Sequence, residues 1–440
     1  MLKKLVWELS AMVAGKSFAG EYRNALKSNS QVFLENLLFS AYNNVPYYRN
    51  ILKNAGVVKD KRLLLTNFDR IPILTKETIR RKEIYLISRD NKRREWFYNT
   101  SSGSTGEPLR FIQDRSFLKW GHATSKYYYK IILGVDEAFS RKILLWAARD
   151  LFRPSLRLRE NAARTIYNAF TNTMVLDCTY MTEADMERYV KAINSYKPKI
   201  IRGYANALYE ICRFVEKRSL AIRTPTILIS SAEMLRDDVR KKIETVFGTK
   251  VYDVYGSREV GGIAGECRHG LLHMFMFNNY VEIVDRKGNR VKKGEDGKVI
   301  VTTLHNYSMP FIRYDIGDMA ILGPEKCNCG NPLPTLRKIT GRTCCFFRKR
   351  DGTLIDDGYF MGIFAQEGLI KSFRVIQEDY AKIRVIVALK EKAKDFDKRS
   401  IEKKIRSVMG EDCSLKWEVV DEIPKANTAK YLYTQSLVSE

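Results

Sequence analysis

The sequence predicts an α/β protein with a large N-terminal domain of layered sheets and helices and a small C-terminal α+β domain. The 440-residue length accommodates more than one hydrophobic core. Between about residues 96 and 320, short β-rich runs alternate with helical stretches, as in layered α/β domains. A compact segment with its own strand and helix follows residue 341. With 45% hydrophobic and 29% charged residues, the composition is typical of a globular protein rather than a disordered one.

Each part of this prediction has a local pattern behind it. Residues 1–95 are expected to be helical, with apolar residues at helical spacing before Pro46, which should stop the helix. In the α/β region, we expect strands at 227–229, 250–252 and 298–301 and helices at 183–196 and 236–247. The last part should contain a strand at 382–387, an amphipathic helix at 400–409 and a polar tail. We therefore expect domains at 1–341 and 342–440.

The formal net charge of +25 makes acidic partners plausible: nucleotides, coenzyme A, an acidic carrier protein or an anionic membrane face. A generic basic composition that aids solubility is the favoured interpretation of this charge. Nucleic acid is not an expected partner, because the basic residues are scattered and no recognised nucleic-acid-binding motif is present.

Cysteines and apolar runs indicate the compartment. Eight cysteines in so long a chain, including the adjacent pair Cys344 and Cys345, fit reduced thiols or metal ligands and a cytoplasmic location. No run approaches the roughly 20 apolar residues of a membrane-spanning helix. Residues 1–15 instead suggest a short amphipathic helix, which leaves peripheral contact with the inner face of the membrane open.

A loop rich in glycine and hydroxyl groups lies between two expected strands, at 97–98 and 109–112. Its residues are Ser101, Ser102, Gly103, Ser104, Thr105 and Gly106. Glycines let backbone N–H groups approach an anion, and hydroxyls can donate to phosphate oxygens. A Walker A loop fits less well, because Glu107 follows Gly106 where that motif requires lysine. The loop thus predicts a polyphosphate site, with a plain hairpin turn as the alternative.

Three further segments follow in order: 253–262 (DVYGSREVGG), 310–318 (PFIRYDIGD) and 340–342 (TGR). Together with the loop, they resemble the adenylate-forming superfamily of acyl-CoA synthetases, adenylation domains and luciferases. The segments 44–49 (NVPYYR) and 71–76 (IPILTK) resemble the phenylacetate-CoA ligase family, including its capsular polysaccharide branch. This resemblance spans roughly residues 30–435 and implies the adenylate-forming fold, a ligase activity and, as one expectation, a homodimer.

The resemblance also implies roles for individual residues. Ser101 to Gly106 would hold the β- and γ-phosphates of ATP. Glu259 would help to hold Mg²⁺, Asp318 would bind the ribose hydroxyls, and Arg342 would approach the ribose from the hinge. Lys430 would meet the α-phosphate and the attacking carboxylate. The adenine pocket would be formed by Ser231, Ala232, Glu233, Asp253, Val254, Tyr255, Gly256 and Ser257, with Tyr255 as the stacking face.

Two positions depart from the family pattern. Residues 343–346 (TCCF) stand where the superfamily has an acidic hinge residue, which weakens the inference that coenzyme A is the final acceptor. Ala429 replaces the glycine that precedes the catalytic lysine, and this restricts the backbone there.

A cluster of cysteine and histidine predicts a second site. Cys267, with His269 and His273 shortly after it, and Cys327 with Cys329 offer three thiolates and an imidazole, a set that suits a closed structural Zn²⁺ site. His269 is the first choice as the histidine ligand, with His273 as the alternative. Ordinary buried cysteines are the other interpretation.

The expected function is activation of a carboxylic acid, whether an aryl, acyl or amino acid, by ATP and Mg²⁺ as an acyl-AMP with release of pyrophosphate. Transfer to CoA, a carrier thiol, or a sugar or amine acceptor would follow, with surface polysaccharide biosynthesis as one setting. Two alternatives stay open: a catalytically degenerate protein that binds a nucleotide or a partner, and a membrane-associated assembly factor. The acid itself cannot be identified from the sequence.

Overall fold

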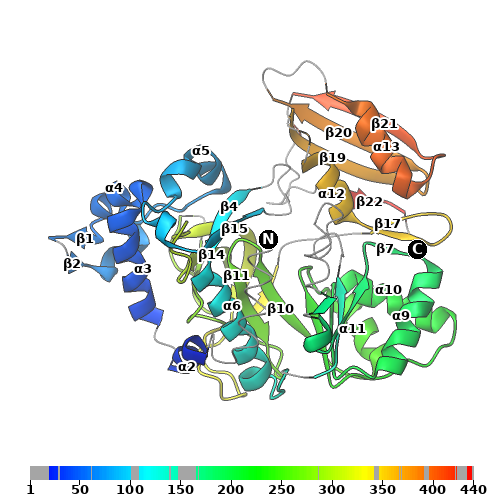
Figure 1. Ribbon diagram of the computed structural model, residues 1–440, viewed down its shortest axis with the longest axis horizontal. Helices are drawn as coiled ribbons and strands as arrows, with labels where there is room; N and C mark the ends of the chain where they lie inside the picture. The colour runs from blue at the N-terminus through cyan, green and yellow to red at the C-terminus, as the bar shows by residue number, and fades with distance from the viewer. Residues whose placement is uncertain are drawn as a thin grey trace.

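The fold is that of a computed structural model (Figure 1). The structure describes residues 19–27, 30–60, 62–100, 109–137, 140–146, 165–166, 168–285, 287–340, 346–365, 367, 369–390, 396–421, 423 and 434–438. Within these ranges, no helix is both long and apolar enough to cross a lipid bilayer.

Helices dominate the first part of the described chain. They are α2 (Ala19–Lys27), α3 (Ser30–Asn44), α4 (Pro46–Asn54) and α5 (Lys76–Leu86), with a short hairpin β1 (Val58–Lys59) and β2 (Arg62–Leu63) after α4. Pro46 occupies the first turn of α4, where its missing N–H would have had no partner within the helix. The proline therefore ends one helix, as expected, and also begins the next.

An eleven-stranded mixed sheet forms the centre, in the order β13-β14-β15-β16-β12-β11-β10-β9-β8-β5-β6. Its parallel part consists of β5 (Lys142–Trp146), β6 (Thr173–Asp177), β8 (Ile200–Gly203), β9 (Ile227–Ser231) and β10 (Val251–Ser257). Its antiparallel part consists of β11 (Gly261–Glu266), β12 (Leu272–Met274), β13 (Asn279–Val284), β14 (Asp296–Thr303), β15 (Tyr314–Leu322) and β16 (Thr335–Ile339).

Helices cover both faces of the parallel part. On one face, α9 (Glu183–Tyr196), α10 (Ala205–Lys217) and α11 (Asp237–Phe247) bury apolar side chains against β5, β8 and β9. On the other face lie α6 (Arg115–Tyr127) and the following π-helical turn (Tyr128–Ile132). The hairpin of β3 (Trp96–Thr100) and β4 (Arg110–Asp114) precedes α6. Because the parallel strands share one direction, their carboxyl ends meet along one edge of the sheet, where ligands bind in folds of this class.

The C-terminal part has its own core and a four-stranded sheet in the order β21-β20-β19-β22. Its elements are β17 (Phe346–Arg348), β18 (Leu354–Asp356), α12 (Asp357–Ala365), β19 (Ile370–Asp379), β20 (Lys382–Leu389), α13 (Lys398–Met409), β21 (Ser414–Val420) and β22 (Thr434–Ser436). Strands β21 and β22 complete this sheet through parallel pairing, and most of the expected polar tail after β21 lies outside the described residues.

The C-terminal part contacts the central sheet region through a small three-stranded sheet. Strand β18 lies between β17 and β7 (Tyr180–Met181), a strand that belongs to the N-terminal part of the chain. Beside it, the Arg348 guanidinium lies 2.5 Å from the Glu210 carboxylate on α10. The expected domain boundary at 341/342 lies outside the described residues.

Candidate functional site

A cavity of about 610 Å³ lies along β10, from Lys250 before the strand to Gly256 near its end, and reaches residues 232–235 after β9. Seven of the residues predicted to bind the nucleotide line it: Ala232, Glu233, Asp253, Val254, Tyr255, Gly256 and Asp318. Ser231 and Ser257 each adjoin a lining residue in the sequence. The structure thus gathers segments that are far apart in the sequence around one cavity, part of which lies at the carboxyl edge of the sheet, where an open α/β sheet binds ligands.

Two lining residues on different strands are joined by a hydrogen bond. The Tyr255 hydroxyl on β10 donates to Asp318 Oδ2 on β15 over 2.8 Å. The Asp318 side chain is buried, so this bond fixes the direction of its carboxylate. A carboxylate held in this way can accept hydrogen bonds from vicinal hydroxyl groups.

The backbone of the cavity wall takes two restricted conformations. Ala232 has a φ of 71°, in the left-handed region that costs a non-glycine residue about 1 kcal/mol or more. Gly256 lies at a bulge between β10 and β11, and a Cβ added there would lie 2.5 Å from the Gly261 carbonyl oxygen. Strain and close backbone approach of this kind are concentrated at ligand sites.

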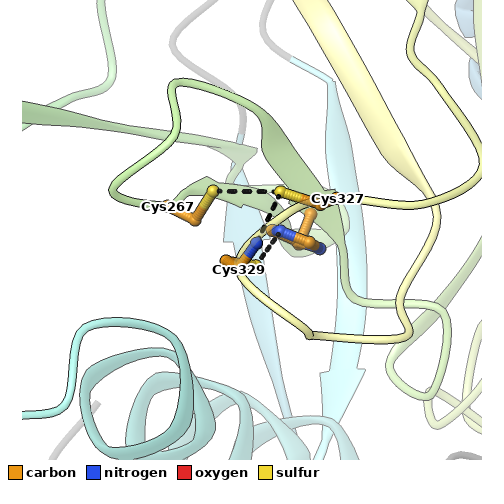
Figure 2. A group of neighbouring side chains, drawn as sticks. Cys267, Cys327 and Cys329 are labelled. Carbon is orange, nitrogen blue, oxygen red and sulfur yellow. Dashed lines mark hydrogen bonds between the residues drawn. The ribbon is translucent and has the colours of Figure 1, made fainter.

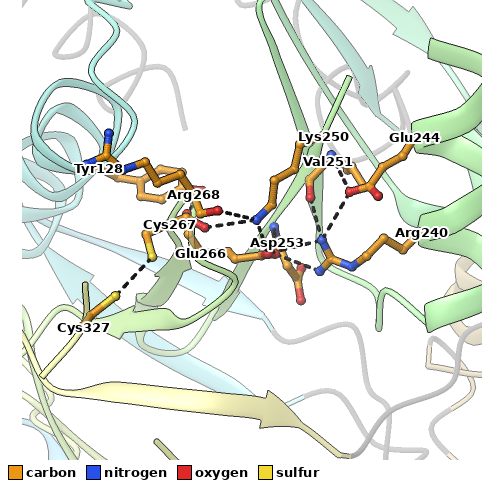
Figure 3. Close-up of polar contacts among 10 residues, drawn as sticks. All are labelled: Tyr128, Arg240, Glu244, Lys250, Val251, Asp253, Glu266, Cys267, Arg268 and Cys327. Carbon is orange, nitrogen blue, oxygen red and sulfur yellow. Dashed lines mark hydrogen bonds and ion pairs between the residues drawn. The ribbon is translucent and has the colours of Figure 1, made fainter. Parts of the chain in front are cut away.

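A buried ionic network forms the floor of the cavity (Figure 3). Glu266, whose side chain is 3% exposed, pairs with Arg240 at 2.8 Å and with Lys250 at 3.4 Å. Arg240 also donates to the Val251 carbonyl oxygen over 2.7 Å, and the Asp253 backbone N–H donates to Glu266 Oε2 over 2.9 Å. The network therefore joins α11, β10 and β11 below the predicted adenine site.

Asp253 is a buried acid within this network. Burial first and the nearby Glu266 second raise the pKa of Asp253 to about 7, while Arg240 opposes the shift. At neutral pH this carboxyl group therefore exists in both protonation states. It can accept a hydrogen bond in one state and donate one in the other.

Glu259, the expected Mg²⁺ ligand, is buried in the turn between β10 and β11. The Gln113 side chain on β4 fixes this turn by donating to the Arg258 carbonyl oxygen over 2.7 Å. Asn99 on β3 in turn donates to Gln113 Oε1 over 2.9 Å. The hairpin of β3 and β4 is therefore connected to the backbone beside Glu259.

Some residues of the predicted ATP site lie outside the part of the chain that the structure describes. Ser101, Ser102, Gly103, Ser104, Thr105 and Gly106, together with Arg342 and Lys430, lie outside the described residues. Their predicted contacts with ATP stay predictions.

Three thiols and one imidazole form a compact group beside the floor network (Figure 2). The ligand atoms of Cys267, His273, Cys327 and Cys329 all lie within 4.8 Å of one another. Cys267 Sγ lies 3.6 Å from Cys327 Sγ, and Cys329 Sγ lies 3.1 Å from His273 Nε2. His273 Nδ1 lies 3.1 Å from the Leu333 carbonyl oxygen, so the other ring nitrogen faces the thiols.

The structure places His273 in this group rather than His269, which was the first choice. His269 is exposed in the turn after Cys267. Strand β12 pairs His273 with Gly265 on β11 and with Thr335 on β16, and this register turns its ring toward the cysteines. The choice between the two histidines therefore required the strand register.

Burial raises the pKa of Cys267, but hydrogen bonds, that of His273 first among them, outweigh burial and bring the value to about 6. A thiolate at neutral pH is the form that binds a metal.

Sequence reasoning did not find the Arg240–Glu266–Lys250 network or Gln113. One signal was available, since Glu266 ends an otherwise apolar strand and Gln113 follows the apolar pair Phe111 and Ile112 in another. Polar residues in buried strands require partners, although the sequence does not identify them.

Comparisons with known proteins show which proteins the chain resembles. Residues 347–436 match the family described as the CapK C-terminal domain. The chain is 23% identical to protein CapK of Staphylococcus aureus over 438 residues, which are 94% of this chain and 91% of that protein. It is 27% identical to a phenylacetate-coenzyme A ligase of Thermus thermophilus over 344 residues, which are 73% of this chain and 71% of the ligase.

A solved structure extends the comparison to the fold. The structure of 2-hydroxyisobutyryl-CoA ligase in complex with 2-HIB-AMP and CoA aligns with a TM-score of 0.57 at 18% identity, covering 95% of this chain and 90% of the ligase. The fold is therefore that of the adenylate-forming ligases. The chain is thus similar over most of its length to CapK and to phenylacetate-CoA ligases, and residues 347–436 match the CapK C-terminal domain.

Proposed function

We propose that the protein uses ATP to activate a carboxylic acid as an acyl-AMP and releases pyrophosphate. The observation that supports this most directly is the cavity of about 610 Å³, where Tyr255, Asp318 and the 232–233 segment meet. The CoA ligases similar to this chain support the same reaction class.

In this proposal, each part of the cavity has a role. The Tyr255 ring stacks on adenine, and Asp318, oriented by the Tyr255 hydroxyl, accepts hydrogen bonds from the ribose. Glu259 binds Mg²⁺, a hard cation that prefers carboxylate and phosphate oxygens. Ser101 to Gly106 hold the outer phosphates, Arg342 approaches the ribose, and the Lys430 ammonium stabilises the charge that develops at the α-phosphate.

The cysteine and histidine group fits a structural zinc ion. Its donors, three thiols and an imidazole, are the set that closed tetrahedral zinc sites use, and the bond to Leu333 orients the histidine ring. Such a site would connect the Cys267 turn to the Cys327–Cys329 loop. Because all four ligand positions would come from the protein, we assign it no catalytic step.

The second half-reaction, which transfers the acyl group to an acceptor, is less well supported than the first. CoA is one candidate, and a carrier thiol, a sugar or an amine are the others. The resemblance to CapK supports a setting in surface polysaccharide biosynthesis. The altered hinge at residues 343–346 supports an acceptor other than CoA.

Exchange of labelled pyrophosphate into ATP, measured across aryl, fatty, hydroxy and dicarboxylic acids, tests the first half-reaction. We expect exchange with at least one acid class and its loss in Lys430→Ala and Glu259→Ala. Absence of exchange with every acid, combined with ATP binding by calorimetry, would instead support a degenerate nucleotide-binding protein, as the hinge and Ala429 would allow.

A further inference from the structure

The carboxyl edge of the parallel sheet carries a second group of side chains next to the nucleotide cavity. From β10 the strand order runs to β9, β8 and β5, so the ends of β8 and β5 lie beyond the cavity along the same edge. Arg202 lies near the end of β8, and Trp146 ends β5. Ser231 ends β9 and directly precedes Ala232, which lines the cavity.

Arg202 is held by contacts that leave part of its guanidinium group available. Its Nη2 donates to Ser231 Oγ over 2.8 Å, and its Cζ lies 5.9 Å from the centroid of the Trp146 ring. Trp146 in turn packs on Tyr204, with ring centroids 4.4 Å apart. The Nε of Arg202 is buried and has no hydrogen-bond partner among the described residues. The side chain is partly exposed overall, so a ligand can reach it.

Two described groups besides Ser231 interact with this guanidinium. Tyr129 shares a side-chain hydrogen bond with Arg202. Glu137 is a buried carboxylate that interacts with Arg202, and burial raises its pKa while Lys142 first and Arg202 second oppose the shift. One acid is therefore shared between two cations. The neighbouring residues on the same face of the sheet, Ile200 and Ile229, are apolar. A guanidinium in such a place is costly unless an anion or several hydrogen-bond acceptors complete it.

From this geometry we propose that Arg202 determines the class of acid: the substrate carries, besides the carboxylate that attacks ATP, a second anionic group that the Arg202 guanidinium binds. This inference rests on the proposed function, because it places the substrate acid at the carboxyl edge of the parallel sheet, beside the proposed nucleotide site. Its reacting carboxylate would point toward the phosphates, and its second anion toward β8. The planar guanidinium suits both carboxylate and phosphonate oxygens, and Trp146 with Tyr204 provides an apolar wall for the carbon chain between the two ends.

The test uses acids matched in length, assayed by pyrophosphate exchange and, separately, by thermal shift without ATP. Glutarate and 4-phosphonobutanoate carry the second anion as carboxylate and phosphonate, and pentanoate lacks it. We expect the full-length wild-type protein to prefer at least one dianionic acid and to be stabilised by it. Arg202→Met should lower the ratio of exchange with the dianionic acid to exchange with pentanoate about 10- to 100-fold, which is the effect of one charge-assisted hydrogen bond. Arg202→Lys should retain part of this preference.

The possible results separate the two proposals. If a dianionic acid stabilises the wild type and this stabilisation is lost in Arg202→Met, the anion site is supported. If the same acid gives no pyrophosphate exchange, only the catalytic proposal fails. Preference for pentanoate in the wild type overturns the anion site while leaving acid activation intact. A third result is that Arg202→Met and Arg202→Gln lose exchange equally with dianionic acids and with pentanoate, while circular dichroism shows that both variants are folded. That result would show that Arg202 has a structural role, and it would also overturn the anion site.

Discussion

The Tyr255 hydroxyl and the Asp318 carboxylate lie 2.8 Å apart although 63 positions separate them in the sequence. The bond joins the part of the site that would face adenine to the part that would face ribose. It is therefore a sensitive point at which to test whether the cavity binds a nucleotide.

Tyr255→Phe removes this hydroxyl and keeps the ring. A hydrogen bond to a charged group contributes about 1.5–3 kcal/mol, so we expect the Kd for ATP to rise about tenfold or more, measured by calorimetry. Tyr252→Phe is the matched control, since that ring lies on the same strand but lines a different cavity. Equal ATP affinity in both variants would contradict the assigned role.

Glu266 provides a test of the cavity floor. Glu266→Ala leaves Arg240 and Lys250 without their shared carboxylate, and we expect a loss of about 3 kcal/mol in the free energy of unfolding, measured by urea denaturation. Glu187→Ala breaks the exposed pair with Lys191 and should change stability little. If the two losses are similar, the buried network does not stabilise the floor.

Asp253 should make stability depend on pH. Its pKa of about 7 in the folded protein exceeds the ordinary value near 4, so between these values the folded state binds more protons than the unfolded state. Stability should therefore fall as pH rises from about 4 to 7, by at most about 1.4 kcal/mol per pH unit from this group, and the loss should be complete above pH 7.

The Asp253→Asn variant isolates this contribution. The difference in unfolding free energy between the wild type and Asp253→Asn should change across this window and become constant above it. A difference that is independent of pH between 4 and 8 would show that Asp253 has an ordinary pKa.

Metal analysis tests the cysteine and histidine group. We expect about one zinc ion per chain by mass spectrometry, lost in Cys327→Ser and in His273→Ala, with a lower melting temperature after treatment with a chelator. His269→Ala should retain zinc because that side chain lies outside the group. Cys413→Ser is the second control, since Cys413 is buried in the C-terminal core. Wild-type protein that contains no metal and is insensitive to chelators would exclude the site.

Local patterns predicted the helices well. The helix expected at 183–196 is α9, whose first turn carries a capping box between Thr182 and Asp185. The helix expected at 236–247 is α11, which ends at the left-handed Gly248. Caps and periodicity depend on neighbouring residues, so the sequence alone contains this information.

The relationships that a single sequence did not reveal depend on strand register and on distant pairing. His273 joins the cysteines only because β12 pairs with both β11 and β16. Arg240 and Glu266 are 26 positions apart and meet because β10 lies beside β11. The predicted nucleotide residues around the cavity came instead from the family resemblance, which summarises such long-range contacts in its motifs.

The pairing of β18 with β7 constrains how the C-terminal part can turn. Only two residue pairs, Leu354 with Met181 and Ile355 with Tyr180, join the strands, and Arg348 with Glu210 adds one ionic contact beside them. Backbone pairing of this kind is either made or broken, so a large rotation cannot proceed by gradual sliding. A large rotation of the part that contains β17 and β18 relative to β7 would therefore have to release this short seam first.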